Sequence, residues 1–324
     1  MPISSPVKPL LLLLLASLTA AVLSVSIGSS AMGLEETLRV LTGSGSELQQ
    51  TLILDLRLPR TLSAFATGGL LAVAGALMQV LLRNPLADPY VLGLSGGAAV
   101  GALLAMLGGA AGFLVSGSAF AGAMLATLMV FGLAHGSGSW TPSRLLLTGV
   151  VVAAGWGAVI TLILSMTPAR QLPGMLYWLM GDLSHAATPW PGLIVLVLVC
   201  LLVFPLGRAL NVLARGSLQA AALGVSVRPL EWSIYLMASL LTATAVTMAG
   251  SVGFVGLVVP HMLRLVLGND QRLILPACAL AGGTLLVLAD TLARVVIAPE
   301  QLPVGVITAL IGVPTFLYLL YRSR

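Results

Sequence analysis

Long apolar runs separated by short polar breaks are the dominant pattern in this chain. The longest runs cover about 18 to 23 residues, which is the length that an α-helix needs to cross the hydrocarbon core of a bilayer. Gly, Pro, Asn and Asp occupy the breaks. The strands of a membrane β-barrel would instead alternate apolar and polar residues over about ten positions, so that class is disfavoured. We predict an all-α, polytopic membrane protein.

The runs predict about ten transmembrane helices within a single transmembrane domain, residues 1–324. The shorter ones are expected to be tilted or partly buried in protein. The longer polar breaks predict two loops on one side, 33–60 and 167–191, and a segment on the other side, 209–228. The predicted spans are Leu10–Met32, Thr61–Leu82, Val91–Leu107, Ala119–Ala134, Leu145–Met166, Gly192–Leu206, Trp232–Met248, Phe254–Leu267, Leu273–Ala293 and Val304–Tyr321.

The first run could be mistaken for a secretory signal, because it follows a cationic end and precedes a cluster of small residues. Its apolar core, Leu10 to Ile27, is longer than that of a typical signal. We therefore expect a retained first span, and N-terminal sequencing of the mature protein would test this.

Charged residues make up only 8% of the chain, while hydrophobic residues make up 58%. The only lysine, Lys8, lies between Val7 and Pro9, whereas an ATP-binding P-loop needs a lysine between a glycine and a Ser or Thr. If ATP drives this protein, another chain must hydrolyse it. The arginines lie mostly at the breaks, so no solvated basic face exists for a nucleic acid.

Basic residues also predict the orientation of the chain. An even number of spans places both termini on the same side of the membrane. If that side is the cytoplasm, ten of the 15 Lys and Arg residues lie inside, in agreement with the positive-inside rule. Both termini and the segment 209–228 are then predicted to be cytoplasmic, and the loops 33–60 and 167–191 to face outward.

Gly93, Gly97 and Gly101 recur every fourth residue. This spacing lets two helices approach closely in a bilayer, so we expect a helix-packing stripe. Asp88, which lies between two prolines in the preceding break, is expected to order a turn or to cap the helix that follows.

The segment 209–228 contains too many Ala and Leu residues for a polar linker, yet its arginines prevent it from crossing the membrane. We predict a short surface helix that starts at Ser217 and ends at Gly224, where glycine can adopt a positive φ. Such a helix could dock on a cytoplasmic partner or rest on lipid headgroups.

Arg57 and Arg60 flank a Leu-Pro pair before the second predicted span, and Arg294 follows the ninth. Exposed arginines suit bidentate capture of carboxylates on a partner, and anchoring to lipid headgroups is the alternative. Asp55 is close enough in sequence to pair with Arg57 or Arg60.

Few residues carry candidate chemistry. Cys200 and Cys278 lie within apolar runs, so we interpret them as packing residues and not as a disulfide. His261 is expected to pack within a helix and not to bind a metal or haem, while His135 and His185 have no ligand spacing. No metal site and no catalytic residue is predicted.

Asp290 precedes Arg294 by four residues, which predicts a local ion pair on one helix face. An ion-coupled secondary transporter, the alternative function, would need acidic residues at mid-membrane depth, and only Asp290 is near a suitable depth. An intramembrane enzyme is disfavoured, because no nucleophile with a nearby base is visible.

Three motifs follow one another between about Arg57 and Tyr321: Asn84-Pro85-Leu86-Ala87-Asp88-Pro89 with Gly93-Leu94-Ser95-Gly96-Gly97-Ala98, then Gly253-Phe254-Val255-Gly256-Leu257-Val258-Val259-Pro260-His261, then Leu302-Pro303-Val304-Gly305-Val306. Together they resemble the permeases of bacterial iron-chelate and vitamin B12 importers. This FecCD-type family belongs to the type II class of ABC importers.

The resemblance implies the type II permease fold, with ten helices, in the bacterial inner membrane. It implies a dimer with a second permease, identical or related, together with two cytoplasmic ATPases and a periplasmic substrate-binding protein. The cargo would be an iron chelate (siderophore or haem) or cobalamin, moved by alternating access. ATP-Mg would bind to the ATPases and no cofactor to this chain. The fifth helix, near Leu145–Met166, would line the route.

The resemblance also implies roles for single residues. Arg57, Arg60 and Arg294 match arginines that meet acidic residues of the binding protein. The element that couples the permease to the ATPase matches the predicted surface helix and its flanks. Its residues are Leu213, Arg215, Leu218, Ala222, Leu223, Gly224 and Val225.

Overall fold

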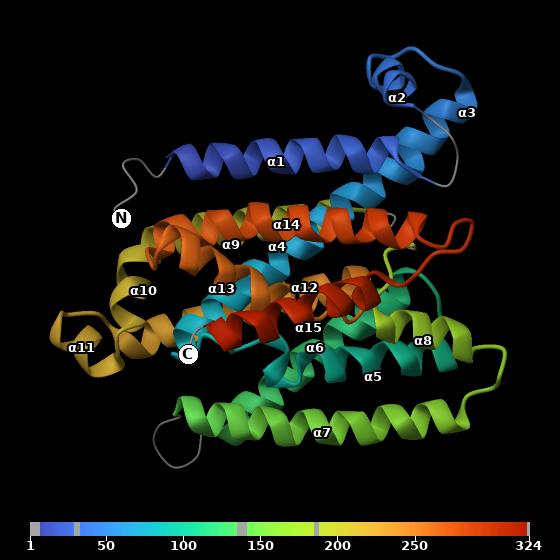
Figure 1. Ribbon diagram of the computed structural model, residues 1–324. Helices are drawn as coiled ribbons and strands as arrows, with labels where there is room; N and C mark the ends of the chain where they lie inside the picture. The colour runs from blue at the N-terminus through green and yellow to red at the C-terminus, as the bar shows by residue number, and fades with distance from the viewer. Residues whose placement is uncertain (1–6, 29–32, 135–140, 185–187, 323–324) are drawn as a thin grey trace.

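The computed structural model describes residues 7–28, 33–134, 141–184 and 188–322, and every regular element in these ranges is a helix. The long helices run side by side in one bundle (Figure 1). The elements are α1 (Val7–Ser26), α2 (Leu34–Leu41), α3 (Glu47–Gln50), η1 (Thr51–Arg57), α4 (Leu58–Leu81), η2 (Pro89–Leu92), α5 (Leu94–Leu107), α6 (Phe113–Ala134), α7 (Pro142–Met166), α8 (Leu172–Met180), α9 (Trp190–Val203), η3 (Phe204–Leu206), α10 (Gly207–Leu213), α11 (Ser217–Ala222), α12 (Val227–Ala249), α13 (Val255–Leu267), α14 (Gln271–Val295) and α15 (Val304–Arg322).

Seven helical stretches in the described residues are long and apolar enough to cross a membrane, which agrees with a polytopic membrane protein. They are Val7–Ser26, Glu47–Leu81, Phe113–Ala134, Pro142–Met166, Trp190–Leu213, Val227–Ala249 and Gln271–Val295. Three shorter apolar helices accompany them: Leu94–Leu107, Val255–Leu267 and Val304–Leu319.

The bundle has two distinct ends. Helix α1 begins, and α15 finishes, at the end that carries α10 and α11, which we call the α11 end (Figure 1). The opposite end carries α2 and α3, and we call it the α2 end.

The predicted loops contain more helix than expected. Residues 33–60 hold α2, α3 and η1, and the last two continue into α4 without a break, so the second span begins at Glu47 and not at Thr61. Pro59 does not interrupt this helix, because it occupies one of the first two positions of α4. There the missing N–H costs little. The predicted loop 167–191 likewise contains α8.

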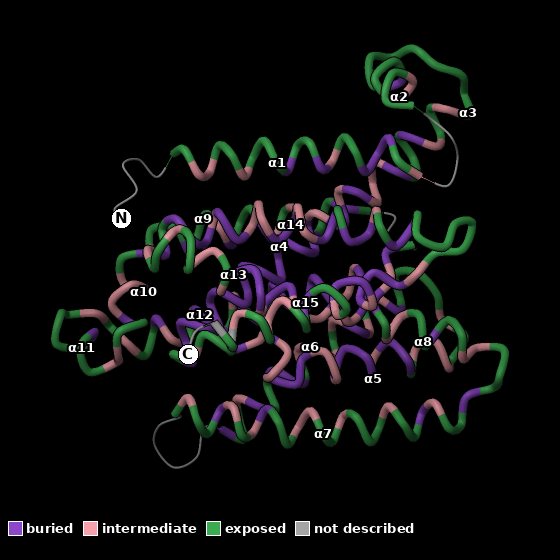
Figure 2. The backbone as a smooth tube through the Cα atoms, in the orientation of Figure 1, coloured by how far each residue is buried: buried purple, intermediate pink, exposed green. Residues whose placement is uncertain are grey.

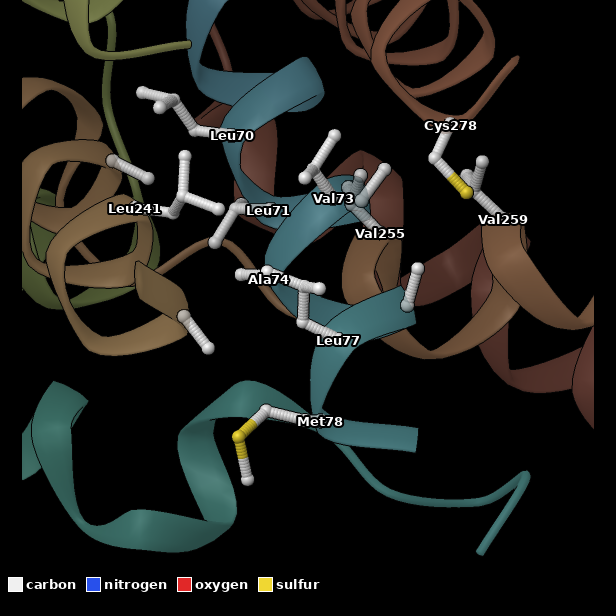
Figure 3. Packing of buried hydrophobic residues seen from close by; sticks show 14 of the residues in the cluster. Leu70, Leu71, Val73, Ala74, Leu77, Met78, Leu241, Val255, Val259 and Cys278 are labelled. Carbon is white, nitrogen blue, oxygen red and sulfur yellow. The ribbon is translucent and has the colours of Figure 1, made fainter. Parts of the chain in front are cut away.

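Helix α4 is the centre of the molecule, because nearly all of its residues are buried (Figure 2). Side chains from three other helices surround it (Figure 3), among them Leu241 of α12, Val259 of α13 and Cys278 of α14. Gly75 lies so close to α13 that a Cβ atom would overlap the carbonyl group of Gly256. This contact lets two backbones touch where lipid gives no hydrophobic drive for association.

Helices α5 and α6 also pack closely. A Cβ atom at Gly97 would overlap Ala126 and approach the carbonyl oxygen of Gly122, and one at Gly101 would overlap the carbonyl of Ser118. The prediction was wrong for Gly93, which is not in this stripe. Gly93 forms the turn between η2 and α5 with a φ of 73°. This conformation favours glycine.

Helix α1 is held against α14 and α4 by polar contacts. The hydroxyl groups of Ser17 and Thr284 are 2.8 Å apart, and those of Ser24 and Thr61 of α4 are 2.9 Å apart. The first apolar run is therefore built into the fold. Helix α7 lies at the edge of the bundle and buries only Leu145, Gly149 and Ile163, as its mostly green and pink tube shows (Figure 2).

Candidate functional site

Asp290, near the end of α14, lies at the centre of a cluster of arginines at the α2 end. Its carboxylate accepts two hydrogen bonds from Arg60 Nε, at 3.1 and 3.0 Å, and one from Arg60 Nη2 at 2.9 Å. Arg294 Nε lies 3.2 Å from Asp290 Oδ2, so the i,i+4 pair predicted from the sequence is present. The Asp290 side chain is only 1% exposed. One buried carboxylate therefore holds two guanidinium groups from two helices.

Arg57 and Arg294 donate hydrogen bonds to the last turn of α1. Arg57 Nη1 donates to the carbonyl oxygens of Val25 and Ser26, at 3.0 and 3.2 Å. Arg294 Nη2 donates to the carbonyl oxygen of Ser24 at 3.1 Å and to its hydroxyl group at 2.8 Å. The carbonyl groups at a helix C-terminus lack intrahelical partners and carry partial negative charge, so the two arginines cap α1.

The expectation that all three arginines are exposed is wrong. Arg57 is 8% exposed and Arg294 is 6% exposed, because both are drawn into the α1 C-terminus. Arg60 is the most accessible of the three, with a side chain 13% exposed, and its Nη1 reaches Gln301 Oε1 at 2.7 Å. The sequence could not show this burial, because the acceptors are backbone carbonyl groups more than 30 residues away.

Asp55 does not take part in this cluster. Its side chain is exposed, and no ion pair links it to a described arginine, so the expected pairing with Arg57 or Arg60 is wrong. The carboxylate on which an ion-coupled transporter would depend, Asp290, is already bound by two arginines.

At the α11 end, α10 and α11 form the short surface helices of the segment 209–228. Helix α11 starts at Ser217, as the sequence predicted, and its C-terminal turn includes Gly224 with a φ of 81°. The N–H of Val225 donates to the carbonyl of Ala220, and the N–H of Gly224 donates to that of Ala221, each at 3.0 Å. These two bonds make a Schellman motif, which requires the left-handed conformation that Gly224 adopts.

Two leucines project from this segment. Leu218 is 87% exposed and Leu223 is 71% exposed, while Arg215 and Ala222 are exposed beside them. Leu213 is 1% exposed and belongs to the hydrophobic core. Leu213 therefore anchors the segment to the bundle and does not contribute to its exposed surface.

The turn between α4 and α5 lies close to α11. Asn84 Oδ1 accepts from the N–H of Leu86 at 2.9 Å, and Asp88 Oδ1 accepts from the N–H of Tyr90 at 2.7 Å, so each side chain orders its own turn. Asp88 caps η2 and not α5. Burial of the Asp88 carboxyl group raises its pKa to about 6. Arg83, at the start of the turn, reaches the Ser217 hydroxyl at 3.5 Å.

A polar network that was not predicted from the sequence joins α10 to α14. Asn211 Nδ2 donates to Asp270 Oδ1 at 2.9 Å, and the N–H of Gln271 donates to Asn211 Oδ1 at 2.7 Å. Arg272 hydrogen bonds to the Asp270 carboxylate and lowers its pKa well below the usual range. The signal that could have revealed this was the Asn-Asp pair before an apolar run, a helix N-cap pattern.

The remaining candidates pack as single groups. The His261 ring makes an edge contact with Phe316, with ring centres 6.4 Å apart, and both cysteines are free, as predicted. His135 and His185 lie outside the described residues. Among the described residues, no three His, Cys, Asp or Glu side chains are grouped as metal ligands would be.

Comparisons with known proteins agree on one family. The model of the FecCD transport family matches residues 12–322. The cobalamin import system permease protein BtuC of Halobacterium salinarum is 43% identical, covering 86% of this chain and 75% of its own length. The hemin transport system permease protein HmuU of Yersinia pestis is 39% identical and covers 96% of both chains.

A solved structure shares the fold. A metal-chelate type ABC transporter in an inward-facing conformation superposes with a TM-score of 0.84 at 30% identity, covering 98% of this chain and 99% of its own. Permease subunits of this kind are non-catalytic, and ATP hydrolysis belongs to partner ATPases. The chain is therefore a member of the FecCD transport family and a permease subunit of an ABC transporter.

Proposed function

We propose that this chain carries an iron chelate (siderophore or haem) or cobalamin inward across the inner membrane of a bacterium by alternating access. Support comes from two relatives, which are named as cobalamin and hemin permeases, and from the metal-chelate type of its structural neighbour. The seven long and three short apolar helices are proposed to be the ten spans of the type II permease fold. In this arrangement the α11 end, with both termini, faces the cytoplasm.

The observation that carries the proposal is the exposed pair Leu218 and Leu223 on the short helix α11. Two large apolar side chains on a rigid, capped helix outside the bundle favour a protein partner over water. A cytoplasmic ATPase that binds ATP-Mg is the proposed partner, and this chain binds no cofactor of its own. Leu213 holds the segment to the core, so that a movement of α11 is passed to the bundle.

The arginine cluster is the proposed docking site for a periplasmic binding protein. Two of the three arginines, Arg60 and Arg294, share the single carboxylate of Asp290, and Arg57 binds backbone carbonyl groups of α1, so the cluster keeps a positive charge. Because Arg57 and Arg294 are buried against α1, Arg60 is the residue proposed to contact an acidic side chain of the binding protein. Arg294 positions it through the shared carboxylate of Asp290, and both Arg294 and Arg57 bind the α1 C-terminus.

A second permease copy, identical or related, is proposed to complete the route. Helix α7 leaves most of its apolar length exposed in the single chain, which supports a position beside a pathway or a second subunit. The apolar surface also matches lipid, so α7 supports this part of the proposal only together with the resemblance to dimeric permeases.

Growth of a deletion strain tests the proposed cargo. The strain would be supplied with single iron sources (a hydroxamate siderophore, a catecholate siderophore or hemin) or with cyanocobalamin as the only corrinoid. The proposal expects loss of growth on one of these sources and its return with the wild-type gene. Undiminished growth on every source would contradict it.

A further inference from the structure

A polar hollow of about 630 Å³ opens at the α11 end, beside the helix proposed to meet the ATPase. Its walls come from the end of α4, the turn after it, the α10–α11 junction, the last turn of α13 and the start of α14. The residues that matter for its chemistry are Arg83, Arg215, Arg264, Asp270 and Gln271.

The hollow carries an excess of positive charge. Arg83, Arg215 and Arg264 line it, and no described carboxylate lies within 4.0 Å of their guanidinium nitrogens. Asp270 is the only acidic residue of the lining. Its carboxylate already forms an ion pair with Arg272, whose Nη2 lies 2.7 Å from Asp270 Oδ2. Glu231 of α12 lies outside the lining and interacts electrostatically with Arg83 without forming an ion pair. An anionic group that entered the hollow would therefore meet three guanidinium groups, none of them held in an ion pair.

Arg264 is held in place for this role. Its Nη1 donates to Gln79 Oε1, and Gln79, which is 4% exposed, donates in turn to the carbonyl oxygen of Leu257 at 3.2 Å. These bonds fix the guanidinium group at the wall of the hollow. Preorganised donors lose little entropy when a ligand binds.

The hollow also contains an acceptor without a partner. Gln271 is 2% exposed, and its Oε1 atom makes no hydrogen bond among the described residues. A buried, unsatisfied carbonyl oxygen costs about 1–3 kcal/mol, so a ligand that brings an N–H donor gains by satisfying it. A peptide with an acidic side chain provides both the carboxylate and the backbone N–H.

We propose that this hollow receives an acidic segment of the cytoplasmic ATPase, with an Asp or Glu carboxylate bound by Arg83, Arg215 and Arg264. This inference rests on the proposed function. It is favoured over a phospholipid because Ala214 and Arg215 of the α10–α11 junction form one wall, so a protein that covers Leu218 and Leu223 must lie beside the opening. The lining also offers no long apolar track for an acyl chain.

The first test measures the affinity of the ATPase for the permease in nanodiscs. The double variant Arg83→Gln/Arg215→Gln is compared with Arg208→Gln, an exposed arginine of α10 outside the lining. We expect the double variant to bind about 10- to 100-fold more weakly, as for charge pairs across interfaces, and Arg208→Gln to bind within about 2-fold of the wild type. Thermal unfolding midpoints should not change, because the substituted side chains are exposed.

The second test identifies the occupant. A benzophenone attached to Ala214→Cys should cross-link to an ATPase peptide that contains Asp or Glu, and the cross-link should disappear in the double variant. Equal affinity of the double variant and Arg208→Gln, or cross-links only to lipid, would overturn the inference and leave the proposed function standing. If the wild-type permease binds no ATPase at all, the proposed function fails instead.

Discussion

Arg60 and Asp290 form a two-pronged ion pair across α4 and α14, with the closest nitrogen and oxygen atoms 2.9 Å apart. The pair connects two helices whose contact is also made by glycines, Gly68 and Gly282, at which added Cβ atoms would overlap the facing backbone. Because Arg294 binds the same carboxylate and the α1 C-terminus, one acidic residue ties three helices together at the α2 end.

Replacement of Asp290 should therefore destabilise the protein more than an exposed ion pair does. The variant Asp290→Asn leaves two guanidinium groups without their counter-ion, and we expect a loss of about 3–5 kcal/mol in the free energy of unfolding. The control Glu35→Gln breaks the exposed pair with Arg39, where both side chains are more than half exposed, and should cost less than about 1 kcal/mol. Reversible unfolding in mixed micelles measures both. Equal effects would show that Asp290 is not the centre of the cluster.

Arg60 should be needed for docking while Arg39, an exposed arginine on α2, should not. The variant Arg60→Gln removes the accessible guanidinium group but keeps a polar side chain beside Asp290. We expect about 5- to 50-fold weaker binding of the periplasmic protein, since charge pairs at interfaces contribute on this scale. Arg39→Gln should bind as the wild type does. Titration of the labelled binding protein onto nanodiscs gives both values, and unchanged affinity of Arg60→Gln would remove its docking role.

The contact between Gly75 and Gly256 predicts a steric penalty at the centre of the bundle. Gly75→Ala forces α4 and α13 apart, and overpacking of this kind costs about 1–3 kcal/mol. Gly117→Ala in α6 is the matched control, because nothing lies within 4 Å of an added Cβ atom there. Alanine is the better helix former, so this variant should be neutral or slightly more stable. Thermal unfolding of both variants checks the difference, and a stable Gly75→Ala protein would be inconsistent with the close contact.

Gly224 should matter through its backbone conformation. With a φ of 81°, alanine would be strained by about 1–2 kcal/mol, whereas asparagine tolerates this region better. We expect Gly224→Ala to lower the transport obtained per ATP hydrolysed, and Gly224→Asn to restore part of it. The ratio of uptake to ATP hydrolysis in proteoliposomes measures this. If Gly224→Ala transports as much cargo per ATP as the wild type, the conformation of α11 is not needed to transmit movement.

Asp88 predicts a pH dependence of stability. Its folded pKa of about 6 lies above the usual aspartate value, so the folded state binds the proton more tightly than the unfolded state. The contribution of Asp88 to stability is therefore largest below about pH 4, falls as the pH rises to about 6 and is constant above that. Asp88→Asn keeps the acceptor for Tyr90 and removes the charge. It should raise the unfolding midpoint at pH 7.5 and change it little at pH 4.5, and an equal effect at both values would contradict the assignment.

Much of the fold follows from the sequence, because membrane helices need long apolar runs and their breaks need polar or flexible residues. Helix α11 and its end at Gly224 were predictable from local signals, since a Schellman turn is a short-range structure. The start of this helical stretch at Glu47 was not predicted, because the charged residues Asp55, Arg57 and Arg60 are typical of a loop in water. The helix can contain these charges because Arg57 binds carbonyl groups of α1 and Arg60 binds Asp290 of α14, while Asp55 is exposed.

The parts that could not be predicted depend on distant contacts. The burial of Arg57 depends on carbonyl groups of α1, and the hollow beside α11 depends on five segments that meet only in the folded chain. Residue types alone indicated that the arginines bind anions, and the structure identifies Asp290 and the α1 C-terminus as partners within the chain.

The central claim is that this chain moves its cargo only with energy from a separate ATPase. The most direct measurement is uptake of radiolabelled ferric siderophore, hemin and cyanocobalamin into proteoliposomes, with the permease alone or together with its partner ATPase and binding protein. We expect ATP-dependent accumulation of one cargo with all three proteins and none with the permease alone. Accumulation by the permease alone, driven by a proton or sodium gradient, would contradict the claim.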